Sequence, residues 1–572
     1  MSAAQYARDE QVSTAEQQAI DQAVKAGVAL HQRGLIDDAE RLYAGILKLA
    51  PKHFDATHLL GVVHQQRGDS DGALRLIGAA IELNNASADA HNNYGRVLLQ
   101  LRRFDEALVS IERALALMPD QPNALINRAA ILIEQQNFAD ALKDIARVLE
   151  KDPHSVDGWT KRGNVLVATG DIQQAIECYS KALSIKPDHT EALNNRGCQF
   201  GEIGRLQDAL VDYDRVIEIN PDHAEAWINR GHMLVELHRE EECLVAYRQA
   251  HTLMPHHPDA TYNEALNLLR LGDFKCGWEK YELRWFIRDF KRSQRKYPVS
   301  RWSGDAVQGP LLVSSEQGLG DQILFSSMLP DLAARVREIT VEVEPRLVSL
   351  FARSFPGVNV VARGTELYDG PAAAHIYMGS LGRHLRPDWG SFPVRENGYL
   401  RCDNELSARL RARLHDGRKV IGLSWSSTNL RYGTSKSVQL HDFASVLRLP
   451  NSRFVDLQYG DTQAERQAVE QDLGISVERL PDVDNLNDID ALASLVAACD
   501  IVVSISNTTA HLAGALGKET YLLVPSGRGR MWCWFRDRDD NPFYPRMRLK
   551  RQKPAQPWSE LVGGIAADIA AR

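Results

Sequence analysis

The sequence predicts an all-α superhelix of stacked helical hairpins, followed by an α/β region with two doubly wound parallel sheets. A 34-residue repeat runs through the first half of the 572-residue chain. From Pro310 onward short apolar runs alternate with helical stretches, and a polar, arginine-rich stretch at 395–418 interrupts that alternation. The predicted organisation is a polar segment at 1–19, the superhelix at 20–285, a linker at 286–309, α/β halves at 310–400 and 415–555, and a C-terminal helix at 556–572.

Composition and charge narrow the class of protein. Hydrophobic residues make up 44% and charged residues 25%, values typical of a soluble globular protein. The net charge of −8 comes from the first half, whereas the second half is slightly basic. A nucleic-acid-binding protein would show a strongly basic face, so we expect no nucleic-acid partner. The mildly basic second half favours an anionic ligand there.

Cysteine usage and the N-terminal residues favour a cytoplasmic protein. The seven cysteines include no Cys-x-x-Cys pair, which favours free thiols in a reducing compartment over a disulfide framework or a zinc site. The first 18 residues are polar with charges of both signs, unlike a signal peptide. No apolar run approaches the roughly 20 residues that span a bilayer. We therefore expect cytoplasmic localisation and no membrane span.

The repeat in the first half is defined by small residues. One series consists of Gly27, Gly61, Gly95, Ala129, Gly163, Gly197, Gly231 and Ala265, and a second follows twelve residues later. We interpret each repeat as two antiparallel helices that approach closely at the small residues, with a proline ending the second helix in most copies. The pattern resembles the tetratricopeptide repeat in eight copies. Such repeats stack into a superhelix whose concave groove is a binding surface.

An asparagine recurs two residues before the small residue, at Asn93, Asn127, Asn195, Asn229 and Asn263. If these amides line the groove, their donors and acceptors can pair with the backbone of an extended peptide of any sequence. That arrangement is similar to the asparagine ladder of the O-linked N-acetylglucosamine transferase. The alternative is that each asparagine bonds a neighbouring helix, and Lys25, Leu59 and Lys161 interrupt the series.

The second half alternates predicted strands and helices. The strands are 310–315, 339–344, 358–361, 374–378, 419–425, 453–458, 500–505 and 519–524. The helices between them are 321–337, 345–354, 464–472, 488–498 and 508–516. We expect the last helix, 558–571, to return to the first sheet.

Two motifs follow predicted strands and open helices. In Gly318-Leu319-Gly320-Asp321 the glycines allow a ligand close to the backbone, and Asp321 lies at the strand end where open sheets bind ligands. In the second motif, Asn507, Thr508 and Thr509 are typical N-cap residues, and with the helix dipole they could hold a diphosphate. The plainer alternatives are a helix cap without a ligand and, for His511, a structural histidine.

Three segments, 318–321, 422–426 and 507–517, resemble the heptosyltransferase-type glycosyltransferases, which have the two-Rossmann GT-B fold. Together with the repeats, the chain resembles bacterial protein glycosyltransferases, including those that modify flagellin. The resemblance implies an inverting, metal-independent enzyme that transfers a sugar from a nucleotide-sugar to a protein hydroxyl. The acceptor, with flagellin as the natural candidate, would lie in the repeat groove. The nucleotide-sugar is a substrate, so no cofactor is expected.

The resemblance also assigns residues. Asp321 matches the general base, and Lys436 matches a basic residue that neutralises the leaving phosphate. The plainer alternative for Lys436 is a solvent-facing charge without such a role. The predicted donor-binding residues are Gly318, Gly320, Ser426, Gln458, Asn507, Thr508, Thr509 and His511, with Gln458 placed to touch the nucleoside base. The chain departs from the family at Ser506-Asn507, where heptosyltransferases carry Asp-Thr, so the donor sugar stays open.

The sequence leaves alternatives open for the segment 525–534, for the acceptor and for the activity. The segment 525–534 either covers the donor with Arg528, Arg530, Trp532 or Trp534, or is a packed loop with core tryptophans. The acceptor is a protein, or else a glycan or lipid-linked sugar. Finally, the chain could be a repeat scaffold with an inactive nucleotide-sugar-binding domain.

Overall fold

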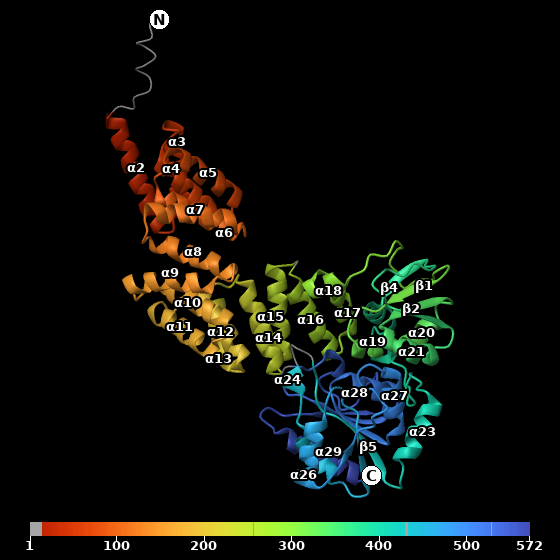
Figure 1. Ribbon diagram of the computed structural model, residues 1–572. Helices are drawn as coiled ribbons and strands as arrows, with labels where there is room; N and C mark the ends of the chain where they lie inside the picture. The colour runs from red at the N-terminus through yellow and green to blue at the C-terminus, as the bar shows by residue number, and fades with distance from the viewer. Residues whose placement is uncertain (1–13, 256, 429–432, 528) are drawn as a thin grey trace. The chain divides into compact units, whose positions relative to one another are not determined.

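The computed structural model describes residues 14–255, 257–428, 433–527 and 529–572, so Arg528 lies outside the described residues. The chain forms two compact units, Met1–Pro221 and Asp222–Arg572. In the described part of the first unit all regular elements are helices, paired as the 34-residue period predicts (Figure 1). They are α2 (Thr14–Gln32), α3 (Ile36–Leu49), α4 (Phe54–Gln66), α5 (Ser70–Leu83), α6 (Ala88–Gln100), α7 (Phe104–Leu117), α8 (Pro122–Glu134), α9 (Phe138–Lys151), α10 (Val156–Thr169), α11 (Ile172–Ile185), α12 (Thr190–Glu202) and α13 (Leu206–Ile219).

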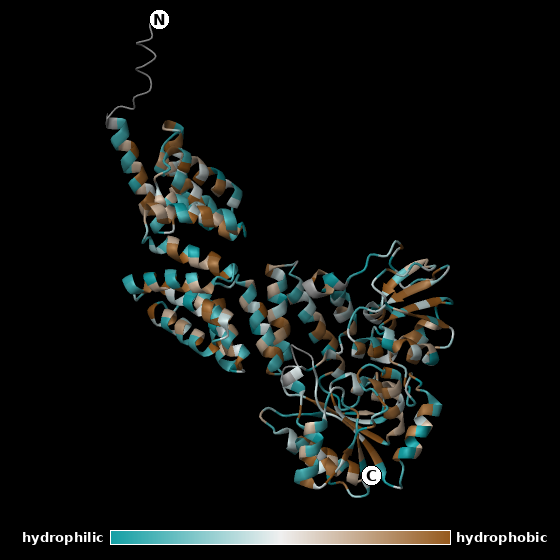
Figure 2. Ribbon diagram, in the orientation of Figure 1, coloured by the Kyte–Doolittle hydropathy of each residue, from teal (hydrophilic) through white to brown (hydrophobic). Residues whose placement is uncertain are grey.

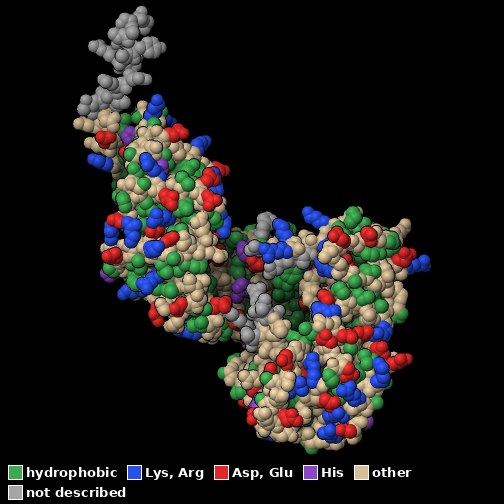
Figure 3. Space-filling view, viewed as in Figure 1, with side chains coloured by type: hydrophobic (Ala, Val, Ile, Leu, Met, Phe, Trp, Pro, Cys, Tyr) green, Lys and Arg blue, Asp and Glu red, His purple; other side chains and the backbone are tan. Residues whose placement is uncertain are grey.

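The recurring glycines mark close helix contacts, as predicted. A Cβ on Gly163 in α10 would lie 2.5 Å from the Tyr179 ring of α11, and one on Gly197 would lie 2.8 Å from the Tyr213 ring. The second helix of each of these repeats therefore packs its tyrosine directly on the glycine backbone of the first. Acidic and basic side chains are interspersed on the face of this unit that Figure 3 shows.

The second unit begins with the last two helical repeats. These are α14 (Ala224–Glu236), α15 (Glu240–Leu253), α16 (Pro258–Leu271) and α17 (Phe274–Tyr281), followed by η1 (Glu282–Phe286) and α18 (Arg288–Ser293). Trp278 of α17 is buried, donates from Nε1 to the Arg386 carbonyl at 2.9 Å, and packs edge-on to Trp532 at 5.3 Å. The repeats predicted as one array therefore divide between the two units. The last repeat, α16–α17, shares a hydrophobic core with the α/β region, and Arg530 hydrogen-bonds the Val235 carbonyl of α14.

The first sheet is parallel, in the order β3-β2-β1-β4. Its strands are β1 (Leu311–Ser314), β2 (Ile339–Val343), β3 (Val358–Ala362) and β4 (Ala374–Tyr377). Around them lie α19 (Leu319–Ser326), α20 (Leu329–Ala333), η2 (Pro345–Leu347), α21 (Val348–Ser354), η3 (Met378–Ser380), α22 (Leu381–Leu385) and η4 (Trp389–Ser391). The helix predicted at 321–337 is divided into α19 and α20. Pro330, in the first turn of α20, cannot continue the hydrogen bonding of a preceding helix.

The second sheet is also parallel, in the order β10-β9-β8-β5-β6-β7. Its strands are β5 (Lys419–Ser424), β6 (Ser452–Asp456), β7 (Val477–Glu478), β8 (Ile501–Ile505), β9 (Glu519–Val524) and β10 (Met547–Arg551). The other elements are α23 (Asn404–Leu414), α24 (Gly433–Lys436), η5 (Leu440–Phe443), α25 (Ala444–Leu447), α26 (Gln463–Leu473), α27 (Ile489–Ala498), α28 (Thr508–Ala515), η6 (Trp532–Trp534) and α29 (Trp558–Ala570). The central strands are apolar and buried, as expected for parallel strands covered on both faces (Figure 2).

Two predictions for the second sheet were incomplete or wrong. The edge strands β7 and β10 were not predicted, since β7 is two residues long and β10 alternates apolar with basic residues. The last helix does not return to the first sheet: Val562 and Ile565 of α29 pack in one cluster with Ile421 and Leu523 of the second sheet. Within the described residues, no helix combines the length and apolar character needed to cross a bilayer.

Candidate functional site

The two predicted motifs meet where α19 packs against α28. Helix α19 begins just beyond the carboxyl end of β1, and α28 begins just beyond the carboxyl end of β8. A Cβ on Gly320 would lie 2.9 Å from Cδ2 of His511. Glycine at 320 therefore permits the two helices to approach, and each helix begins at the carboxyl edge of its sheet, the edge at which open α/β sheets generally bind ligands.

Asp321 occupies the first turn of α19 and is half-buried. Burial raises the pKa of its carboxyl group to about 6, and the charge of Glu316 adds to this. The Gly318 N–H and the charge of Lys436 act in the opposite direction. A carboxylate with this pKa is ionised at neutral pH and is still basic enough to take a proton from a hydroxyl.

Lys436 is the last residue of α24, in the half of the unit that holds the second sheet, and only 8% of it is exposed. Burial lowers the pKa of its ammonium group, and the charge of Asp321 raises it. The charge of Lys436 in turn lowers the pKa of Asp321, so each of the two groups favours the charged form of the other. No ion pair joins Lys436 to a carboxylate among the described residues. A buried cation without a paired carboxylate favours an anionic ligand.

His511 holds the contact between the two helices. Its Nδ1 hydrogen-bonds the Tyr544 hydroxyl at 2.7 Å, and its ring stacks on Trp534 at 4.9 Å. Burial lowers the pKa of the imidazole to about 3, so the ring is neutral at physiological pH. These contacts fit the alternative that His511 is a structural histidine. Direct contact of His511 with a nucleotide-sugar stays a prediction.

The start of α28 is capped by its own side chains. Asn507 accepts a hydrogen bond from the Ala510 N–H at 3.2 Å, and its Nδ2 donates to the Ser424 hydroxyl at 2.8 Å. Thr509 is fully buried, with its hydroxyl 3.5 Å from the Leu457 carbonyl. Thr508 is the half-buried residue of the three, so its hydroxyl is the one best placed to reach a ligand.

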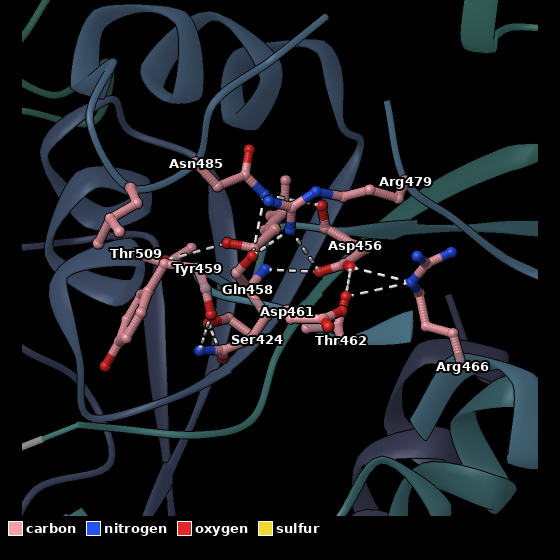
Figure 4. A network of polar contacts seen from close by, with 12 residues as sticks. Ser424, Asp456, Gln458, Tyr459, Asp461, Thr462, Arg466, Arg479, Asn485 and Thr509 are labelled. Atoms are coloured by element: carbon pink, nitrogen blue, oxygen red, sulfur yellow. Dashed lines mark hydrogen bonds and ion pairs between the residues drawn. The ribbon is translucent and has the colours of Figure 1, made fainter. Parts of the chain in front are cut away.

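Gln458 belongs to a polar network beside the same strand ends (Figure 4). Its Oε1 accepts from the Ser424 hydroxyl at 3.0 Å and from the Ser426 N–H at 2.9 Å, which holds the loop after β5. Gln458 is 1% exposed, so its side chain supports the loop, and contact with a nucleoside base stays a prediction.

Behind Gln458 lies Asp456, which sequence reasoning missed. Its carboxylate accepts from the Thr462 hydroxyl at 2.5 Å and pairs with Arg466 and Arg479, each at 3.3 Å (Figure 4). Asn485 donates to the Asp456 and Gln458 carbonyls at 3.1 Å. Asp456 is fully buried, and a lone acidic residue at a strand end carries no sequence signal for such a network.

The segment 525–534 is a packed loop in its described part. Trp532 and Trp534 are buried, and the Trp534 indole donates to the Ser506 hydroxyl at 2.8 Å. Arg530 bonds His238 Nδ1 at 2.7 Å and the Val235 carbonyl at 2.6 Å, both at the end of α14. The two tryptophans are therefore core residues, the second of the two alternatives for this segment. Arg530 hydrogen-bonds the repeats.

The last repeat supplies further residues that sequence reasoning assigned no role. The guanidinium of Arg284 donates to both oxygens of Glu316 at 2.9 Å, and both side chains are buried. The Gln317 side chain donates to the Tyr281 hydroxyl at 2.5 Å. Glu316 and Gln317 directly precede the glycine motif, so these contacts hold the loop that leads to Asp321. The available signal was an acidic residue, Glu316, two positions before the first glycine of the motif.

The asparagine series bonds neighbouring repeats. Asn127 donates to Asn92 at 2.8 Å and Asn195 donates to Asn164 at 3.0 Å within the first unit. Asn93 contacts His58 at 3.0 Å in the first unit, and Asn263 contacts His232 at 2.7 Å in the second. Asn229 is half-buried and also has an interacting partner. The inter-helix alternative is therefore shown, and contact with a peptide stays a prediction.

Comparisons with known proteins address mainly the repeats. Tetratricopeptide-repeat family models match residues 58–124, 98–165 and 190–223, and a TPR-repeat model matches 163–198. Protein FlbA of Caulobacter vibrioides is 34% identical over 329 residues, covering 53% of this chain and 54% of FlbA. The match thus spans about half of that relative's length.

Two solved structures that match part of this chain are described as repeat proteins. A tetratricopeptide repeat protein from Parabacteroides merdae is 17% identical, covering 44% of this chain and 99% of its own, with a TM-score of 0.37. YrrB, described as a TPR protein with an unusual peptide-binding site, is 24% identical, covering 32% and 95%, with a TM-score of 0.25. The chain thus contains tetratricopeptide repeats, and its C-terminal region contains parallel α/β sheets.

Proposed function

We propose that this protein is an inverting, metal-independent glycosyltransferase of the GT-B type. It transfers a sugar from a nucleotide-sugar to a hydroxyl group of a protein acceptor that the repeat groove recruits, with flagellin as the favoured acceptor. One observation carries the proposal: α19, which carries Asp321 beyond the end of β1, packs against α28 beyond the end of β8, so that a Cβ on Gly320 would lie 2.9 Å from Cδ2 of His511. The buried Lys436 influences the pKa of both Asp321 and His511.

The proposed reaction is a single displacement. Asp321 accepts the proton of the acceptor hydroxyl, whose oxygen forms a bond to the anomeric carbon of the donor. The bond between that carbon and the phosphate oxygen breaks on the opposite face, so the configuration inverts. The nucleotide leaves with the bonding electron pair. Lys436 and the N-terminal amides of α28 stabilise its negative charge.

A thermal-shift series on the full-length chain tests donor binding, with UDP, CMP, ADP and GDP as probes. A nucleotide that binds the folded state raises the melting temperature, and its sugar conjugates then serve in hydrolysis and transfer assays with flagellin. We expect Asp321→Asn to keep the shift and to reduce transfer at least a hundredfold. The matched control is Asp369→Asn, which changes an exposed carboxylate in the first α/β half.

Each outcome separates the alternatives. A shift without transfer in wild type would support a scaffold that binds nucleotide-sugar. Transfer to a glycan or lipid-linked sugar, but not to flagellin, would replace the protein acceptor. Full activity of Asp321→Asn would remove Asp321 from the proposed chemistry.

A further inference from the structure

A buried ion pair joins the end of the helical repeats to the loop that leads to Asp321. Arg284 lies in η1, directly after the last repeat, and its Nη2 donates to both carboxylate oxygens of Glu316 at 2.9 Å. The Arg284 side chain is fully buried, and only 1% of the Glu316 side chain is exposed. Hydrogen bonds between charged partners are shorter and stronger than neutral ones, so this pair fixes the carboxylate firmly.

The guanidinium of Arg284 also bridges separate segments of the chain. Its Nη1 bonds the Tyr281 carbonyl at 3.1 Å and the Glu282 carboxylate at 3.0 Å, both within its own segment. Its Nη2 donates in addition to the Ser380 hydroxyl at 2.8 Å, just after β4. Because the two nitrogens serve different segments, a lysine at 284 could keep only one of the two sets of bonds.

The loop that contains Glu316 is held on several sides. A Cβ on Gly379 would lie 2.2 Å from Glu316 Oε1, so the carboxylate packs directly on the backbone after β4. The next residue, Gln317, donates from its side chain to the Tyr281 hydroxyl at 2.5 Å. Its carbonyl accepts from the Gln322 side chain at 2.8 Å. Residues 316 and 317 therefore have little freedom to move while these contacts persist.

The Asp321 carboxylate lies against this loop. Its Oδ2 is 3.6 Å from the position that a Cβ on Gly318 would take. Gly318 is also the N-cap of α19, where its carbonyl accepts from the Gln322 N–H at 3.1 Å. The charge of Glu316 raises the pKa of Asp321, in agreement with the short path between them. A change in the backbone at 316–318 would therefore displace the proposed base.

We propose that Arg284 is a positioning residue for the proposed base: by holding Glu316, it fixes the backbone at 316–318 against which the Asp321 carboxylate lies. Arg284 acts through Glu316 and contacts no substrate. The segment that ends the repeats thereby completes the geometry of the transferase site. The inference rests on the proposed transferase function and deepens it, since it adds a residue on which the same reaction depends.

Arg284→Lys in the full-length protein tests the role, because it keeps the charge and removes one set of bonds. We expect kcat for transfer to fall at least about tenfold, since a small misplacement of a reacting group costs up to about a hundredfold in rate. The KM for flagellin and the affinity for the nucleotide should stay within about twofold, because Arg284 contacts neither. The matched control is Arg128→Lys, which changes an arginine that bonds the buried Asp144 twice at 2.7 Å in the first unit.

Glu316→Gln adds a readout that a loss of stability alone would not move. The variant keeps the shape of the side chain and removes a negative charge that raises the pKa of Asp321, so the acidic limb of the pH–rate profile should move to lower pH. Neither variant changes the other titratable groups within the electrostatic reach of Asp321. These are Tyr262, Tyr281, Lys436, Cys533 and Tyr544. Burial raises the pKa of the three tyrosines and the cysteine, so these groups stay protonated near pH 6.

The two proposals fail in different ways. A folded Arg284→Lys with wild-type kcat, or an unmoved limb in Glu316→Gln, would overturn the positioning role and leave the transferase intact. A loss in Arg284→Lys confined to the KM for flagellin would place Arg284 in acceptor binding and would also overturn it. If Arg284→Lys does not fold, the limb of Glu316→Gln decides alone. A wild type that neither hydrolyses nucleotide-sugars nor modifies flagellin would overturn both proposals.

Discussion

The proposed roles of Asp321 and Lys436 predict how the transfer rate depends on pH. Because a base must be ionised, we expect the transfer rate to rise through pH 6 and to level above it, following the Asp321 pKa of about 6. The charge of Lys436 lowers that pKa. Lys436→Met should therefore move the acidic limb to higher pH and lower the plateau on the order of a hundredfold. The pH–rate profiles of wild type and variant measure both effects.

The direction of the shift is the decisive part of that experiment. A lower plateau with an unmoved limb would mean that Lys436 assists the leaving group without sensing Asp321. A limb that moves to lower pH would contradict the electrostatic arrangement of the site. Lys550→Met is a matched control, because that lysine of β10 pairs with Asp568 of α29.

At the scale of single elements, the glycines of the repeat helices differ in what surrounds them. A Cβ at Gly163 would meet the Tyr179 ring at 2.5 Å, whereas a Cβ at Gly78 of α5 would meet Tyr94 at an ordinary 3.5 Å. Replacing glycine with alanine favours the helical conformation by about 1 kcal/mol at either position. We expect Gly78→Ala to raise the urea midpoint and Gly163→Ala to lower it, through overpacking of about 1–3 kcal/mol. A rise in both variants would show that the tyrosine moves aside without cost.

The elements that sequence could predict are those with a strong local signal. The 34-residue period predicted the helix pairs, because glycine recurs where the second helix of a repeat packs a side chain on the first. At Gly163 and Gly197 that side chain is a tyrosine ring. The buried strands were found from their apolar runs. Strand β10 was missed because only alternate residues are buried, and α29 was misplaced because an apolar face does not specify which sheet it covers.

The candidate site likewise contains residues that the local sequence predicts and residues that it does not. Asp321 was predictable because it follows a strand and two glycines, and the N-cap role of Asn507 follows from its residue type. Tyr281 and Arg284 were not, because their contacts with Gln317 and Glu316 depend on how the last repeat packs against the loop after β1. Nothing near them in the chain indicates that contact.

At the scale of the whole chain, the compact units do not follow the change from helices to strands. That change lies at 286–309 in the sequence, yet the second unit begins at Asp222. Residues of the expected linker are bound to the first sheet: Arg295 donates to Glu342 at 2.8 Å, and the Trp302 N–H donates to the His375 carbonyl at 2.8 Å. A continuous period in sequence thus does not define a continuous structural unit.

This boundary predicts how fragments behave. A chain of residues 222–572 should melt cooperatively and keep any nucleotide-induced thermal shift. A chain of residues 286–572 should aggregate or melt at a much lower temperature, because it lacks the buried Phe274 and Trp278, side chains whose loss costs about 3–5 kcal/mol each. Differential scanning fluorimetry of both fragments measures the difference. Equal melting temperatures would show that the last two repeats add nothing to the stability of the α/β core.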